Sequence, residues 1–135
     1  MIDISDIVTD RVRSAVRAVK RTATVIKGLI EDPTSIPCTF IREMDNRTYK
    51  KSETDSGENH AVLVYEINTF GSIADGASVQ AAIDAEMQNM KFERSFSKTI
   101  PNADNTLCRV IARYTAIVEA GKTANGETVY QMYRR

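Results

Sequence analysis

Residues Leu107–Glu119 alternate in polarity with a period of two, which restricts this part of the chain to a β-strand. One face of this strand carries only apolar or small side chains: Cys108, Val110, Ala112, Tyr114, Ala116 and Val118. The other face is half apolar and half polar: Leu107, Arg109, Ile111, Arg113, Thr115 and Ile117. Because a sheet face left to water should be almost entirely polar, we expect something to cover part of this second face.

Two further strand-like runs, Cys38–Asp45 and Ala61–Phe70, flank the polar segment Asn46–His60. β-Branched and aromatic residues fill both runs, which predicts a long antiparallel hairpin. Val62, Val64 and Phe70 fall opposite Ala61, Leu63, Tyr65 and Ile67, so the second run is also predicted to be apolar on both sides. The connection is longer than the usual hairpin loop of about 2–5 residues. We therefore expect a mobile loop over about residues 46–59 that becomes ordered on binding a partner.

Two segments have the three- and four-residue spacing of an amphipathic helix. The first runs from Ser5 to about Arg21, with Ser5 expected to cap its first turn. Its apolar stripe is Ile4, Ile7, Val8, Val12, Ala15, Val16 and Val19. The second starts within Gly71–Gly76, which breaks the preceding strand, and ends near Met90, with a stripe of Val79, Ile83, Met87 and Met90. Alanines at positions 81, 82 and 85 are expected to let this helix lie close to the element it covers.

Two shorter runs complete the predicted sheet, at Thr22–Ile30, where Gly28 marks a bend, and at Phe92–Ile100. The prediction is one α+β domain over residues 1–135, in the order α-β-β-β-α-β-β, with two helices packed on one face of a mainly antiparallel sheet. Residues 120–135 either fold back as a hairpin or project as an arm to a partner. Fold-back is favoured, because Asn125-Gly126 is typical of a type I′ turn.

Two helices can cover only one face of such a sheet. The half-apolar second face therefore needs another covering, and a neighbouring copy of the same chain is the simplest candidate. The chain has 18 basic and 18 acidic residues, so no net charge opposes self-association.

The charge balance also leaves no overall field to attract nucleic acid or an anionic membrane. The first helix is locally basic, and a DNA-binding face there is a minor alternative to a solvated surface. Its cations are Arg11, Arg13, Arg17, Lys20 and Arg21. The acidic start predicts no export signal, and no apolar run is long enough to span a membrane. Cys38 and Cys108 are expected to be buried, reduced thiols of a cytosolic protein.

The sequence offers no convincing catalytic, cofactor or metal site. Gly121-Lys122-Thr123 matches the end of a phosphate-binding loop, but Ala116 stands where the pattern needs glycine. His60 is the only histidine, which rules out a site of several imidazoles. A Cys–His nucleophile pair and an acid–base pair of Glu43 with Glu66 stay open, and both are disfavoured because nothing around them suggests activation or a desolvated cleft.

The central hairpin resembles a known family. The segments that carry the resemblance are Pro37-Cys38, Glu43-Met44-Asp45-Asn46, and Glu58-Asn59-His60-Ala61 leading into Val64-Tyr65-Glu66-Ile67-Asn68. They are similar to the small tail terminator proteins of long-tailed bacteriophages and prophages, also called tail completion or head–tail joining proteins. The similarity extends loosely from the first helix to about Val118.

The resemblance implies a non-enzymatic structural protein, without cofactor, in the tail or neck of a virion assembled in the bacterial cytoplasm. It implies a ring, expected to be a hexamer, that stops tail-tube polymerisation at the head-proximal end. The implied partners are other copies, the tail tube protein and the head connector or neck proteins. DNA would pass through the lumen without specific recognition, and no membrane is involved.

Our candidate interface residues combine the half-apolar face with the polar loop: Arg109, Ile111, Arg113, Arg47, Tyr49, Lys50, Lys51, Glu53, Asp55 and Glu58. The alternatives are another neck component, such as a head-completion stopper or adaptor, and a small nucleic-acid-binding module.

Overall fold

The computed structural model describes residues 1–28, 36–48, 60–101 and 107–134, which form two helices and six strands. The helices are α1 (Ser5–Val19) and α2 (Ile73–Asn89). The strands are β1 (Thr24–Lys27), β2 (Cys38–Thr48), β3 (His60–Ser72), β4 (Glu93–Pro101), β5 (Leu107–Lys122) and β6 (Thr128–Tyr133). The predicted α+β class and the order of its seven elements are confirmed, and β6 follows as a further strand.

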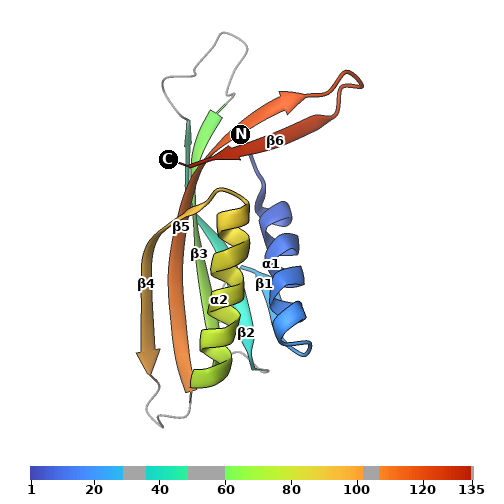
Figure 1. Cartoon of the computed structure of the whole chain (residues 1–135). Helices are drawn as coiled ribbons and strands as arrows, with labels where there is room; N and C mark the ends of the chain where they lie inside the picture. Colours follow the sequence, from blue (N-terminus) through green and yellow to red (C-terminus); the bar gives the residue numbers. More distant parts are fainter. Residues whose placement is uncertain (29–35, 49–59, 102–106, 135) are drawn as a thin grey trace.

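The strands form one sheet in the order β1-β2-β3-β5-β4, with β6 also paired to β5. Every pairing is antiparallel except that of β1 with β2. β4 and β6 pair with successive parts of β5, β4 up to Thr115 and β6 from Ile117 onward. Both helices lie on the same face of the sheet, with α1 beside β1 at one end of the strand order and β4 at the other end (Figure 1).

The core lies between the helices and the sheet, where the apolar stripes of the helices pack against the apolar face of the strands. Alternate residues of β3 and β5 are fully buried there, among them Tyr65 and Tyr114. The helices contribute buried residues at the predicted spacing: Val8, Val12, Val16, Val79, Ile83 and Met87. Tyr65 packs edge-on against Phe92, with 5.8 Å between the ring centroids. Ile7 and Val19 of the predicted first stripe are not part of the core, since they are 39% and 52% exposed.

The start of α1 differs from the prediction, because Ser5 does not cap the helix. Ile4 occupies the N-cap position and has no side-chain cap. Ser5 is instead the first helical residue, and the carboxylate of Asp3 accepts hydrogen bonds from its backbone N–H at 2.9 Å and its hydroxyl at 2.7 Å. The negative charge of Asp3 also suits the positive end of the helix dipole.

β3 passes directly into α2, and glycine rather than alanine brings this helix close to the sheet. A Cβ atom at Gly76 would lie 2.9 Å from Sγ of Cys108 on β5. Ala81 and Ala85 face solvent, so the expectation that they allow the close approach is wrong, and of the three alanines only Ala82 is partly buried. The packing distance at this end of α2 therefore depends on the missing side chain of Gly76.

Ser72 caps α2 by accepting a hydrogen bond from the backbone N–H of Asp75 at 3.1 Å. Ser72→Ala is expected to lower the free energy of unfolding by about 1 kcal/mol, because that N–H loses its partner. Chemical denaturation measures the difference. Ser78→Ala is the matched control: its hydroxyl donates to the Ala74 carbonyl within the helix, and its loss should change stability by less than about 0.5 kcal/mol. Equal effects for the two variants would contradict the cap.

The β2–β3 hairpin is longer than the sequence indicated. Asn46–Thr48 continue β2, and His60 begins β3, so the start of the expected loop is strand. A register shift between Glu43 and Asp45 marks a bulge in β2. The rest of the expected loop lies outside the described residues.

The chain after β5 folds back, since β6 pairs antiparallel with Ile117–Lys122. The turn is not type I′, because Gly126 has φ +81° while Asn125 has a negative φ. The N–H of Gly126 instead donates to the carbonyl of Thr123 at 2.9 Å. The β5–β6 hairpin extends beyond the two helices, at the end of the helical layer where α1 begins (Figure 1).

Candidate functional site: the open face of the sheet

The sheet has one face covered by α1 and α2 and a second that no described helix or strand covers, which we call the open face. Residues opposite one another on paired strands lie on the same face of the sheet. The strand register therefore identifies three rows of residues at the centre of the open face, each running across β2, β3, β5 and β4. These rows are Arg42-Glu66-Arg113-Phe96, Phe40-Asn68-Ile111-Lys98, and Cys38-Phe70-Arg109-Ile100. Arginine and aromatic residues are thus concentrated there.

Glu66 is the centre of a hydrogen-bonded network on this face. Arg42 Nη2 lies 3.2 Å from Oε1 and Arg113 Nε lies 2.9 Å from Oε2, on opposite sides of the carboxylate. Asn68 Nδ2 also donates to Oε1 at 3.1 Å. The side chain of Glu66 is only 4% exposed, so its charge requires these partners.

The pKa of the Glu66 carboxyl follows from this environment. Burial on its own would raise the pKa, but the hydrogen bonds from Asn68 and Arg113 and the charges of the two arginines outweigh burial and hold it below its ordinary value. Glu66 is therefore a structural anion at neutral pH, and it orients Arg42 and Arg113 along the sheet.

Two arginines of β5 lie over phenylalanine rings. The Arg109 guanidinium is 5.4 Å from the ring centroid of Phe70 and that of Arg113 is 5.2 Å from Phe96, both in cation–π range. Arg109 Nε donates to Asn68 at 2.9 Å, as Arg113 Nε donates to Glu66. Among the described residues, each of these arginines hydrogen-bonds to the sheet through its Nε atom. Within the described part of the chain their Nη groups make no hydrogen bond, so they suit a carboxylate from outside.

Phe40 stacks on Phe70, with ring centroids 5.3 Å apart, but at 1% exposure Phe40 is buried and adds no accessible aromatic surface. Phe96 and Ile100 of β4 are exposed on the same face. Aromatic and arginine side chains are enriched in the parts of protein–protein interfaces that contribute most to affinity. The open face therefore has the composition of an interface.

The structure brings together the predicted residues Arg109, Ile111 and Arg113 in the three rows. Arg47 lies on the same face but farther along β2, opposite Val62, where it pairs with Asp45 at 2.8 Å. It belongs to a strand and not to the expected loop. The remaining predicted residues lie outside the described part of the chain: Tyr49, Lys50, Lys51, Glu53, Asp55 and Glu58.

Several residues of the open face escaped the sequence analysis, chiefly Glu66, Asn68, Arg42 and Phe96. The signal was present in β3, since Glu66 and Asn68 fall on the same side as Val62, Val64 and Phe70. The prediction that β3 is apolar on both sides is therefore wrong at its centre. Glu66 is also not a surface carboxylate, since its side chain is only 4% exposed and both of its carboxylate oxygens bind arginines.

The pairs considered for catalysis are not brought together. Glu43 contacts the hydroxyl of Tyr65 at 3.2 Å on the helix-covered face, whereas Glu66 lies on the open face. His60 begins β3, while both cysteines lie beside the other end of this strand, Cys38 opposite Phe70 and Cys108 opposite Gly71. Both thiols are free and buried, as predicted, and burial raises the pKa of each.

Other predicted absences can be checked only within the described residues. No group of three or more His, Cys, Asp or Glu side chains there is placed to hold a metal ion. Neither described helix is long and apolar enough to cross a membrane. Lys122 ends β5 and is followed by the hairpin turn, which is incompatible with a phosphate-binding loop.

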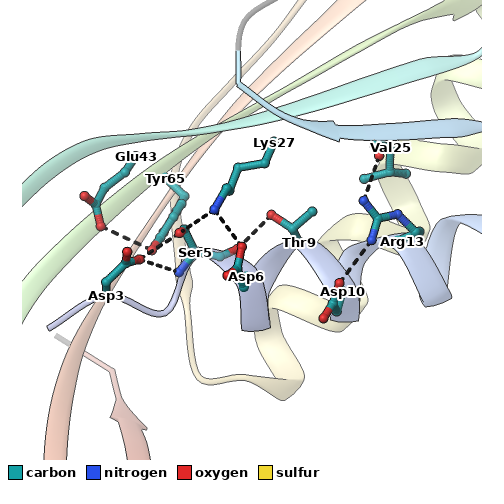
Figure 2. Close-up of polar contacts among 10 residues, drawn as sticks. All are labelled: Asp3, Ser5, Asp6, Thr9, Asp10, Arg13, Val25, Lys27, Glu43 and Tyr65. Atoms are coloured by element: carbon teal, nitrogen blue, oxygen red, sulfur yellow. Dashed lines mark hydrogen bonds and ion pairs between the residues drawn. The ribbon is translucent and has the colours of Figure 1, made fainter.

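The cations of α1 mostly contact the protein itself. Arg11 pairs with Glu86, Lys20 lies 3.6 Å from Asp75, and Arg17 donates to the carbonyl of Ala23. Arg13 binds both Asp10 at 3.0 Å and the carbonyl of Val25 at 3.1 Å (Figure 2). These contacts fix α1 on its neighbours and leave fewer cations for a polyanion.

The architecture defines the class of protein as an α+β domain with one helical layer on a mostly antiparallel sheet. No protein-family model matches the chain, and no curated protein matches it. Among solved structures, the fold is similar to that of a chain from the virion of a native gene transfer agent particle, with a TM-score of 0.53 and 16% sequence identity. The match covers 83% of this chain and 91% of the virion chain. At this identity the likeness establishes the fold.

Proposed function

We propose that this chain is a structural protein of a phage-like virion and, more specifically, a tail terminator that assembles as a ring at the head-proximal end of the tail. In this role the ring stops polymerisation of the tail tube and provides the surface to which the head docks. The protein carries no catalytic function in this proposal.

The observation that carries the proposal is the open face with its exposed Phe96 and Ile100 and its oriented arginines. A sheet of this kind is stabilised when a partner covers the second face. The fold likeness to a virion chain supports a particle assembled from many protein copies as the setting.

A ring subunit needs two different complementary surfaces, because each copy contacts one neighbour on each side. The open face supplies one of them. We propose that the polar segment 49–59 contacts the tail tube or the head connector. The residues predicted for that contact are Tyr49, Lys50, Lys51, Glu53, Asp55 and Glu58.

The second candidate is another neck component, which would bind the head side and not the tube. A nucleic-acid-binding module is less well supported, because Arg11, Arg13, Arg17 and Lys20 are already engaged within the chain. That role requires affinity for DNA that falls steeply with salt.

The test is to add the purified protein separately to tail tubes and to tailless heads of the cognate particle and to image both by electron microscopy. We expect one ring at one end of each tube and an arrest of further growth when tube protein is in excess. Binding to tailless heads alone would reassign the chain to the neck. Arg109→Ala should reduce ring formation, and Ser78→Ala, on the far side of α2, should not.

A further inference from the structure

Four carboxylates gather where α1 begins, at the edge of the molecule formed by α1 and β1. We call the carboxylates Asp3, Asp6, Asp10 and Glu43 (Figure 2), together with the exposed Ile7 that follows Asp6 on α1, the acidic edge. Asp6 pairs with Lys27 and Asp10 with Arg13. The Asp6 and Asp10 side chains are 85% and 74% exposed and protrude farther than their partners.

The opposite edge carries the opposite charge. On β4 and β5, the open face has the exposed Lys98, Phe96 and Arg113 beside the partly exposed Arg109, and the carboxylate of Glu66 is buried next to them. We call Phe96, Lys98, Arg109 and Arg113 the arginine patch. Three cations thus face one carboxylate. The two surfaces lie at opposite ends of the strand order, since β1 is one edge of the sheet and β4 the other (Figure 1).

We propose that the acidic edge of one copy docks on the arginine patch of the next copy, and that this head-to-tail contact joins subunits of the ring. The inference rests on the proposed function and identifies the partner of its open face. In this contact the carboxylates of Asp6 and Asp10 accept hydrogen bonds from the Nη groups of Arg109 and Arg113, and Ile7 packs beside Phe96. A contact between two different surfaces, on opposite edges, closes into a ring when each copy is rotated by a constant angle.

Charge complementarity identifies a second copy as the occupant. The whole chain has equal numbers of acidic and basic residues, so a surplus of cations at one edge is matched by a surplus of carboxylates elsewhere on the same chain. Both surfaces also present one exposed apolar residue among the charges, Ile7 at 39% and Phe96 at 40% exposure. Polynucleotide phosphate would match only the arginine patch and would leave the acidic edge repelled.

The test traps the contact covalently, so that it does not depend on a high affinity. Ser14→Cys places a thiol one turn beyond Asp10 on α1, and Ser95→Cys places another beside Phe96 on β4; both positions are exposed. The chain with both changes, oxidised at high concentration, should form a ladder of disulfide-linked oligomers. The matched control combines Ser95→Cys with Ser78→Cys on α2 and should give no ladder. The native thiols are buried and contribute little.

Charge reversal then tests the chemistry. Lys98→Glu with Arg109→Glu, which spares the partners of Glu66, should reduce the ladder at least about tenfold, because like charges now face each other. Adding Asp6→Lys and Asp10→Lys to the same chain should restore it. Circular dichroism and thermal unfolding verify that each variant is folded.

The outcomes separate the contact from the role. A ladder equal to that of the control, or one indifferent to charge reversal, overturns the contact even if rings still form on tail tubes. A specific, charge-dependent ladder supports the contact, and the absence of rings on tubes would then refute only the terminator role.

Discussion

Replacing Arg42 and Arg113 together with alanine should lower the free energy of unfolding by about 3 kcal/mol at neutral pH, more than the sum of the single changes. Each single change leaves one guanidinium on the Glu66 carboxylate. Because both arginine side chains are partly exposed, at 42% and 44%, each single loss should cost only about 1 kcal/mol. The double change leaves a buried carboxylate without a cation.

The pH dependence gives this prediction a second readout. In the native protein the pKa of Glu66 is held below its ordinary value, so its contribution to stability is present above about pH 4.3 and is lost as the pH falls through the folded-state pKa. Without the two arginines, burial raises the pKa, and the carboxylate destabilises the fold above that pH. The difference between the two proteins should therefore shrink on acidification.

Urea denaturation between pH 4 and pH 7 measures both effects. The matched control is Lys27→Ala with Arg47→Ala, two cations whose carboxylate partners are exposed. This control should lose less than about 1 kcal/mol, in additive steps. A strictly additive loss in the Arg42 and Arg113 variant, unchanged by pH, would show that Glu66 does not depend on the pair.

Gly76→Val should lower the free energy of unfolding by about 2–3 kcal/mol, because its side chain would overlap Cys108 and push α2 away from β5. Ala77→Val, at the exposed position next to it, is the control and should cost less than about 1 kcal/mol. Thermal unfolding measures both variants.

The sign of the stability change on Gly76→Ala, measured with and without Cys108, tests whether contact with Cys108 is the cause. Gly76→Ala alone adds a Cβ atom at 2.9 Å from Sγ of Cys108, so it should not stabilise the protein. In a Cys108→Ala background the nearest remaining contact is that with Val110 at 3.5 Å, and the same change should stabilise by up to about 1 kcal/mol through helix propensity. The same effect in both backgrounds would exclude Cys108 as the cause.

The sequence was sufficient to predict the faces of β5 and the buried stripe of α2, because both follow from periodicity alone. It was not sufficient for the network around Glu66. Arg42 and Arg113 are 24 and 47 residues from Glu66, and they meet it only through the register of three strands. That register includes the bulge between Glu43 and Asp45, which has no sequence signature that we recognised.

The predictions for the alanines of α2 and for Ser5 failed for a related reason. Whether alanine or glycine lies against the sheet depends on how α2 is rotated about its axis, and tertiary packing determines that rotation. The position of the first helical turn depended on Asp3, one of several acidic residues near the start of the chain. Local pattern thus predicts elements and their faces, whereas the contacts between elements require the register.

β5 runs without interruption from the row of Arg109 to the turn of the β5–β6 hairpin, over Leu107–Lys122. The same strand thus belongs to both the central sheet and the β5–β6 hairpin, and no loop separates the two. If copies assemble as proposed, a tilt of the hairpin against a neighbour would be transmitted along β5 to Arg113, so the twist of this one strand would help to set the angle between neighbouring copies.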